Sequence, residues 1–287
     1  MSGRAADRAA APAVAAAPVV APRAGSADAA AAAALAARLE AYYTRYYRDA
    51  LGIPGWRELV SVRLDDVAHE DRRAARLAGV LGRPLAGLSL LNVGCGTGGF
   101  NAAAARAGAA AWGVDVSADA VAIAAARAPA GRIARAAAEA LPFPAGAFDV
   151  VYCYSTLEHV ADARRAVAEM VRVLRPGGAL YLHTPGRWAA FETHYKVVWL
   201  PGLPAAVQRA YLRLRGRPPG FLATLRLSSL AECRRLVAAA GATVARVLDD
   251  GARRPVPSRL WPAIRAYYVV CRVRPHVELL AVKGSSR

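Results

Sequence analysis

Residues 90–100 read LLNVGCGTGGF, an apolar run that breaks into glycines before an alanine-rich segment. The pattern predicts a strand, a tight turn and the start of a helix. Glycines in such a turn permit positive φ angles and let backbone N–H groups approach a ligand closely. The stretch therefore predicts a binding turn for a nucleoside-containing ligand, and the rest of the chain must show which ligand it is.

A second apolar segment, 111–116, reads as a strand that contains Asp115 near its end. This carboxylate comes about 20 residues after the turn, the usual spacing for an acid that binds the two hydroxyls of a ribose. Gly94, Gly96 and Gly99 also fit the dinucleotide pattern of a dehydrogenase. The turn and the aspartate alone therefore leave the kind of nucleoside open.

Apolar strand-like runs alternate with helical segments through the middle of the chain. Strands are expected at 90–93, 111–116, 132–136, 148–154, 179–184, 243–248 and 277–282, and helices at 100–107, 118–127, 163–173 and 228–240. Such alternation predicts an α/β fold with a parallel, doubly wound sheet.

The segments around this sheet domain differ from it in composition. Residues 1–34 are rich in Ala and Pro and are expected to form a disordered tail, and 35–87 are expected to form a helical cap. In the cap, Leu39, Tyr42, Tyr43, Tyr46 and Tyr47 share one helical face, which favours packing over substrate contact. The sheet domain spans 88–287 and carries insertions at 186–227 and 252–275.

Composition limits the classes of protein that fit. The chain has 287 residues and a net charge of +17, so it is expected to attract polyanions or an anionic membrane unless its arginines only solvate the surface. Cys95, Cys153, Cys233 and Cys271 form no CxxC pair, which favours reduced thiols in a cytoplasmic protein. No apolar run approaches the roughly 18–20 residues that span a bilayer.

Several motifs together resemble one enzyme family. They are NVGCGTG at 92–98, AEALPFP at 138–144, FDVV at 148–151, LEHV at 157–160 and RVLRPGG at 172–178. Their order and spacing resemble the class I S-adenosylmethionine-dependent methyltransferases, in particular the ubiquinone/menaquinone branch that methylates small molecules. A nicotinamide dehydrogenase is not expected to show the LPFP, LEHV and LRPGG motifs together.

The resemblance implies a Rossmann-like, seven-stranded methyltransferase sheet with S-adenosylmethionine as cofactor. It implies that Asp115 binds the ribose hydroxyls and that Val116 packs on the adenine. The full set of implied cofactor residues is Asn92, Gly94, Cys95, Gly96, Gly98, Asp115, Val116, Ala138, Glu139 and Tyr154. Two positions depart from the family pattern: Asn92 replaces the usual Asp, and Ala137 removes an acceptor for the adenine amino group.

The acceptor side is predicted from the end of the fourth strand. The ubiquinone O-methyltransferase branch has a Glu where this chain has Ser155, and that Glu holds a divalent metal together with the Glu and His of the next turn. Glu158 and His159 are present but Ser155 cannot supply the third carboxylate, so no catalytic metal is expected. His159 and His194 are the candidate general bases. Candidate substrate-binding residues are Ser155, His159, His183, His194 and Tyr195.

Both insertions are basic and contain aromatic residues. The first has Arg187, Lys196, Arg209, Arg213, Arg215, Arg217 and Arg226 against the single acid Glu192. The second has Arg253, Arg254, Arg259, Arg265, Arg272 and Arg274 and no acid. Such segments suit either an anionic membrane surface or a lid that packs on the sheet domain.

The leading hypothesis is methyl transfer from S-adenosylmethionine to an oxygen or carbon of a small or lipid-like acceptor. The expected location is cytoplasmic, with peripheral contact to the membrane, and no obligate protein partner is evident. A tRNA-type methyltransferase is an alternative that the charge suggests, although no RNA-binding module is present and nucleic acid is not the expected partner. A non-catalytic binding protein on the same fold is the other alternative, suggested by Ala137 and Ser155.

Overall fold

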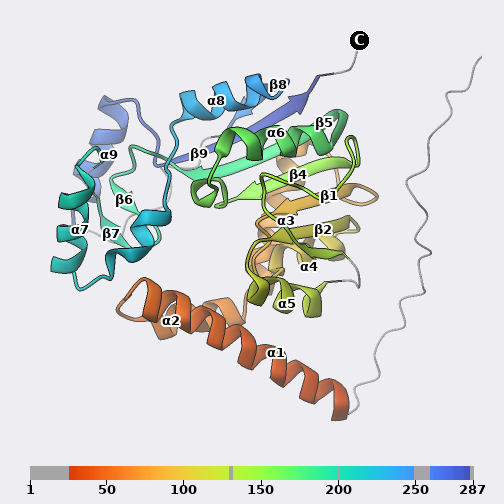
Figure 1. Cartoon of the computed structure of the whole chain (residues 1–287), viewed down its shortest axis with the longest axis horizontal. Helices are drawn as coiled ribbons and strands as arrows, with labels where there is room; N and C mark the ends of the chain where they lie inside the picture. The colour runs from red at the N-terminus through yellow and green to blue at the C-terminus, as the bar shows by residue number, and fades with distance from the viewer. Residues whose placement is uncertain (1–25, 129–131, 200, 249–258, 285–287) are drawn as a thin grey trace, which may run out of the picture.

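The computed structural model describes residues 26–128, 132–199, 201–248 and 259–284, and its centre is a seven-stranded sheet (Figure 1). The strand order is β3-β2-β1-β4-β5-β9-β8. Strands β1 to β5 are parallel, and β9 pairs antiparallel with both β5 and β8. The strands are β1 (Ser89–Val93), β2 (Ala110–Asp115), β3 (Ile133–Arg135), β4 (Phe148–Tyr154), β5 (Leu174–Pro185), β8 (Ala242–Val247) and β9 (His276–Lys283). The predicted α/β fold is confirmed, but the sheet is mixed and not parallel throughout, because β9 runs antiparallel to both of its neighbours.

Helices cover both faces of the sheet. The helices are α1 (Ser26–Thr44), α2 (Trp56–Leu64), α3 (Val67–Leu81), α4 (Gly99–Arg106), α5 (Ala118–Arg127), α6 (Ala163–Val173), α7 (Ala205–Leu214), α8 (Leu230–Ala239) and α9 (Trp261–Val270). Shorter turns of helix are η1 (Arg45–Ala50), η2 (Leu157–His159) and η3 (Pro219–Thr224). Their start and stop signals are local: the side chains of Ser117, Asp162 and Ser229 cap α5, α6 and α8, and Gly82 ends α3 at a φ of 69°.

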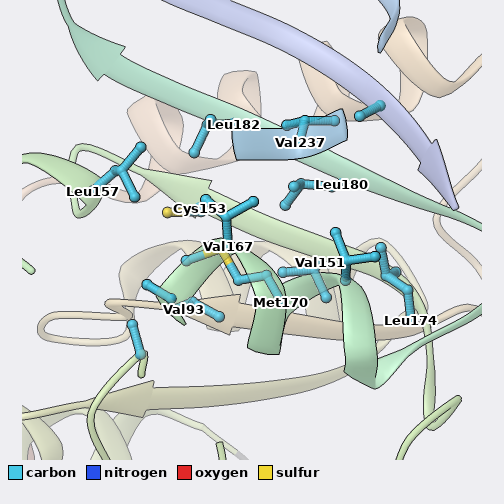
Figure 2. Packing of buried hydrophobic residues seen from close by; sticks show 14 of the residues in the cluster. Val93, Val151, Cys153, Leu157, Val167, Met170, Leu174, Leu180, Leu182 and Val237 are labelled. Atoms are coloured by element: carbon cyan, nitrogen blue, oxygen red, sulfur yellow. The ribbon is translucent and has the colours of Figure 1, made fainter. Parts of the chain in front are cut away.

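Alternate residues of each central strand enter different cores. Val150 and Tyr152 of β4 pack with residues of α3 and α4, whereas Val151 and Cys153 pack with residues of α6 and α8. Figure 2 shows the second of these cores, where Met170 of α6 lies against the sheet. Because both faces are covered, the central strands β1 and β4 are mostly apolar, which is why their positions could be predicted from short apolar runs.

Helix α1 begins within the segment that the sequence predicted to be a tail up to residue 34. It starts at Ser26, and residues 29–34 are all alanine, the strongest helix former. Residues 1–25 lie outside the described part of the chain.

The cap and the first insertion share a core of their own. Tyr47 and Val60 of the cap pack with Tyr195, Trp199 and Leu212 of the insertion. The insertion contains a short hairpin that the sequence did not predict, β6 (Phe191–Glu192) paired with β7 (Val197–Val198). Two segments far apart in the chain therefore fold as one unit, which in Figure 1 lies beside and below the end of β5.

The described part of the second insertion packs on the first. Ile264 and Tyr268 of α9 form a small core with Ala190, whose backbone N–H donates to the Tyr268 hydroxyl at 2.9 Å. Arg253 and Arg254 lie outside the described residues. Among the helices that are described, none combines the length and the apolar character that crossing a bilayer requires.

Thiol reactivity tests this packing. Cys95, Cys153 and Cys233 are buried, and burial raises the pKa of the Cys95 and Cys233 thiols to about 12, whereas Cys271 is exposed. Iodoacetamide applied to the native chain at pH 8 is therefore expected to label Cys271 and to spare the other three thiols, as read by peptide mass spectrometry. All four should react after denaturation. Equal labelling of Cys153 in the native protein would contradict the described core.

Candidate functional site

The glycine-rich turn connects β1 to α4 and is anchored to β2. The N–H groups of Gly94 and Cys95 both donate to the carbonyl of Val114, at 2.8 and 2.9 Å. Gly94, Gly96 and Gly98 have φ angles of 75°, 53° and 79°, a region that favours glycine. The turn therefore needs glycine at these three positions for conformation alone.

The surroundings of the three glycines differ. A Cβ on Gly94 would lie 2.1 Å from Thr156 Oγ1, and one on Gly98 would lie 2.8 Å from Ala124 Cβ. A Cβ on Gly96 would meet no atom within 4 Å. The turn is therefore closed by packing at Gly94 and Gly98 and open at Gly96, which is the geometry of a cradle for a ligand.

Asp115 lies beside the open side of the turn. Its Oδ2 accepts the N–H of Gly96 and its Oδ1 accepts the N–H of Ser117, both at 2.9 Å. These two bonds fix the direction of the carboxylate and leave its remaining lone pairs for a ligand with two hydroxyls. The next residue, Val116, is 60% exposed and can cover a flat apolar group.

The other residues implied for the cofactor lie deeper in the structure. Asn92 is buried and its amide donates to Asn101 at 2.7 Å, which joins β1 to α4. Ala138 is part of the sheet core, and Glu139 accepts the backbone N–H of Ala161 at 2.8 Å. Cys95 is also buried. The carboxylate of Glu139 is thus bonded to the loop before α6. A contact between Glu139 and the adenine of a cofactor remains a prediction.

The helical cap supplies side chains to the turn, although the sequence favoured packing for its tyrosine face. The Tyr43 hydroxyl lies 2.8 Å from Thr97 Oγ1 in the turn, and Arg45 pairs with Asp119 of α5 at 2.7 Å. Burial, and after it the charge of Asp115, raises the pKa of Tyr42 to about 12. The tyrosine-rich helix was the available signal, but its contact with the turn depends on tertiary packing.

The end of β4 carries Tyr154, predicted to bind the cofactor, and Ser155, predicted to bind the substrate. The Tyr154 ring stacks on His183 at 4.0 Å and lies under the Arg73 guanidinium at 4.1 Å. Ser155 has a φ of 53°, and its Oγ lies 3.5 Å from His183 Nδ1. His183 is itself buried in β5, so it supports Tyr154 and Ser155 from behind.

Directly after β4, a cluster of ionisable side chains gathers under the first insertion. His194 Nδ1 lies 2.7 Å from Glu192 Oε1, and His194 Nε2 lies 3.8 Å from Glu158 Oε1. The other oxygen of Glu158 accepts the Thr184 hydroxyl at 3.0 Å. His159 completes the group, with its ring 5.4 Å from that of His194. The structure thus brings together both predicted bases, His159 and His194, with two glutamates that sequence reasoning did not assign to one site with them.

Burial and neighbouring charges shift these groups in different directions. Burial raises the pKa of Glu158 to about 7 and lowers that of His159 to about 4. Burial also favours the neutral form of His194, but the hydrogen bond and charge of Glu192 outweigh it and raise the pKa of His194.

Tyr195, a predicted substrate contact, is fully buried in the unit formed by the cap and the first insertion. Its hydroxyl donates to the carbonyl of Pro218 at 2.9 Å and accepts the N–H of Leu222 at 3.0 Å. Because both functions of the hydroxyl are used, Tyr195 holds the insertion together and does not face an acceptor.

A cavity of about 330 Å³ lies inside the first insertion. Most of its lining is apolar, with Arg209 and Gln208 of α7 as polar groups and Glu192 on the side of the histidine cluster. The other lining residues are Arg187, Trp199, Gly202, Ala205, Pro219, Leu222, Ala223, Leu225 and Leu227. The cavity is of the size that binds small organic molecules and is separate from the glycine turn.

Comparison with known proteins agrees with this geometry. Residues 91–182 match the family described as "Methyltransferase domain". An uncharacterized methyltransferase of Mycobacterium sp. (strain JLS) is 35% identical over 139 residues, which cover 46% of this chain and 53% of that protein. The demethylmenaquinone methyltransferase of Thermus thermophilus is 41% identical over 75 residues, 25% of this chain and 34% of that protein. The chain spans about half the length, or less, of these relatives.

A solved structure shows the same fold. The [4+2]-cyclase SpnF superposes with a TM-score of 0.52 at 24% identity, over 75% of this chain and 82% of that chain. Residues 91–182 thus match a methyltransferase domain, and the seven-stranded sheet that contains them has the fold of this neighbour. This match agrees with the methyltransferase family that the sequence motifs resemble.

Two alanine substitutions distinguish the contribution of the turn to stability from its contribution to cofactor binding. Gly98→Ala is expected to destabilise the chain by more than the ~1–2 kcal/mol of a positive φ, because its Cβ also collides with Ala124. Gly96→Ala carries only the φ cost, but its methyl group enters the open side of the turn and should weaken S-adenosylmethionine binding. Denaturant unfolding and calorimetric titration measure the two effects. Unchanged cofactor affinity in Gly96→Ala would show that the ligand does not lie over this glycine.

Proposed function

We propose that this chain transfers a methyl group from S-adenosylmethionine to an oxygen or carbon of a small or lipid-like acceptor. The observation that carries the proposal is the open cradle at Gly96 beside the fixed carboxylate of Asp115. In that cradle, Gly94, Gly96 and Gly98 would pass under the cofactor, Asp115 would accept its ribose hydroxyls and Val116 would cover its adenine. Bound S-adenosylmethionine supplies an electrophilic methyl group, which needs no further activation by the protein.

The chain's own residues then have to orient the acceptor and exclude water. The cap can help to exclude water, because Tyr43 contacts Thr97 in the turn and Arg45 contacts Asp119 beside it. The end of β4 can help to orient the acceptor, because Ser155 and the cluster of Glu158, His159 and His194 lie at the carboxyl edge of the strand. Open α/β sheets present their sites at this edge.

The cavity in the first insertion supports a small, largely apolar acceptor. Its volume of about 330 Å³ is too small for a folded nucleic acid, and Trp199, Leu222 and Leu225 give it an apolar wall. Its wall at Glu192 adjoins the histidine cluster, since Glu192 holds His194 at 2.7 Å. An acceptor seated here would have its apolar body in the cavity and its reactive end toward that cluster. A quinone-type compound, like the substrate that the Thermus relative's name implies, has this form.

Peripheral contact with an anionic membrane is part of the same proposal. Leu214 of α7 is 84% exposed and Val270 of α9 is 78% exposed, and both helices also carry arginines. Exposed apolar side chains beside basic ones suit the headgroup region of a membrane, from which a lipid-like acceptor would be drawn.

Calorimetric titration with S-adenosylmethionine and S-adenosylhomocysteine, with NADH as the control ligand, tests the cofactor. Transfer of a labelled methyl group to reduced quinones and simple phenols then tests the acceptor class. Binding of the first two ligands and not of NADH is the expected result. Absence of binding to either methionine derivative would instead favour a non-catalytic protein on this fold.

Replacement of Asp115 tests the ribose assignment. Asp115→Ala is expected to weaken S-adenosylmethionine binding by about 1–3 kcal/mol, because two ligand hydroxyls lose their acceptor. Asp71→Ala is the matched control, since Asp71 forms an exposed pair with Arg106 on the surface of the cap. An Asp115→Ala variant that folds normally and binds the cofactor as well as the parent chain would refute the assignment.

A further inference from the structure

We propose that Glu158, His159 and His194 form a binding site for a divalent transition-metal ion, with Zn²⁺ as the ion that tests it. Each residue offers one ligand atom, and these three atoms lie within 4.8 Å of one another. Glu158 and His159 are adjacent in η2, and His194 is brought to them by the turn after β6. No metal was expected from the sequence, because Ser155 cannot act as a ligand carboxylate.

The ligand set indicates the kind of ion. Two imidazoles and one carboxylate are typical of zinc and ferrous sites, whereas Mg²⁺ and Ca²⁺ prefer oxygen ligands throughout. Three protein ligands also leave a coordination position open for water or a substrate oxygen, as in catalytic zinc sites. Ser155 takes no part, since its Oγ is directed to His183.

The carboxylate of Glu158 is the strongest single indication of a missing ligand. The side chain is fully buried, and its Oε1 has no hydrogen-bond partner among the described residues. A buried carboxylate oxygen without a partner is costly, so its environment is incomplete as it stands. The oxygen that Thr184 binds is the other one, Oε2. Within the described part of the chain, Oε1 therefore has no hydrogen bond, and its contact with His194 Nε2 is a long one of 3.8 Å.

The distance between Glu158 and His194 is suited to an ion between them. Oε1 and Nε2 are 3.8 Å apart, which is too long for a hydrogen bond. Two ligand atoms that each lie about 2.0–2.1 Å from one zinc ion can be separated by up to about 4 Å. His159 is exposed and can complete the set by rotation of its side chain, without any change in the core.

Glu192 orients His194 for this role. It lies 2.7 Å from Nδ1, so Nδ1 carries the proton in the neutral ring and the lone pair of Nε2 points toward Glu158. The second oxygen of Glu192 accepts the backbone N–H of Tyr195. A carboxylate behind a metal-binding histidine is the usual arrangement that fixes ring orientation. Glu192 is thus a positioning residue.

What the ion does in catalysis rests on the proposed function. An acceptor hydroxyl bound at the open position would release its proton to water at a lower pH than when free. Its oxygen would then form the bond to the methyl carbon as the carbon–sulfur bond breaks, which leaves S-adenosylhomocysteine and an unchanged ion. In this role His159 and His194 are ligands and not general bases.

The test measures metal binding alone, without cofactor or acceptor. The full chain, free of any affinity tag and stripped with a chelator, is titrated calorimetrically with Zn²⁺ and, separately, with Mg²⁺. We expect one Zn²⁺ per chain and no Mg²⁺ binding in the same range. His159→Ala and His194→Ala should each weaken Zn²⁺ binding by about 100-fold, and Glu192→Gln by about 10-fold.

Controls separate this site from other sources of binding. His69→Ala removes a histidine of α3, and Cys271→Ser removes the exposed thiol, and neither should change the affinity. Replacement of His194, which is packed under the insertion, could disturb the fold, whereas replacement of the exposed His159 should leave it intact. Circular dichroism checks the fold of both variants. Failure of the parent chain to bind Zn²⁺, or binding that survives in His159→Ala and His194→Ala, overturns the proposal.

The outcome is independent of the proposed function. Titration with S-adenosylhomocysteine in the same variants should give the parent affinity, since none of the three ligands belongs to the glycine cradle. Zinc binding without cofactor binding would support the metal site and reject the methyltransferase proposal. Cofactor binding without zinc binding would reject the metal site and leave His194 as the candidate base.

Discussion

The contact between the glycine turn and the end of β2 is the constraint on which the site depends. Three acceptors of β2, the Val114 carbonyl and the two oxygens of Asp115, bind the turn and the start of α5. The turn can approach so closely because Gly94 and Gly98 have no side chains to collide with Thr156 and Ala124. A rigid strand edge thereby holds backbone groups and a carboxylate in fixed positions around an open space. Such preorganisation lowers the entropy that a ligand loses on binding.

The unit formed by the cap and the first insertion closes the same edge of the sheet. Its core joins Tyr47 of the cap to Tyr195 and Trp199 of the insertion, and Arg217 donates to the carbonyl of Gly52 at 2.7 Å. The cluster draws its apolar side chains from both segments. The two segments therefore form one unit.

The cluster of Glu158, His159, Glu192 and His194 combines neighbours in the sequence with residues that come more than 30 positions later. Glu158 and His159 come from the turn that follows β4, so the sheet places them, whereas Glu192 and His194 come from the insertion. Burial of Glu158 is possible because Thr184 satisfies one of its oxygens and because His194 faces the other. A charged group buried in this way is retained at a cost in stability, which is typical of functional sites.

Much of the fold was predictable from the sequence, because its signals are local. The strand β4 and the helices α5 and α6 have the predicted bounds, since buried apolar runs and capping residues depend only on near neighbours. The turn at 94–98 and Asp115 were likewise recognisable from spacing. Helix α1 begins earlier than predicted because the alanine run favours helix formation by itself.

The sequence determined the match to a methyltransferase domain and the place of the glycine turn beside Asp115, because one strand–turn–helix unit and the following strand contain these groups. Only the tertiary structure decided which side chains from distant segments meet around it. The contact of Tyr43 with the turn, the burial of Tyr195 and the meeting of His194 with Glu158 join residues that are tens of positions apart. No local periodicity encodes such contacts, because they arise when separate segments bury their apolar faces against each other.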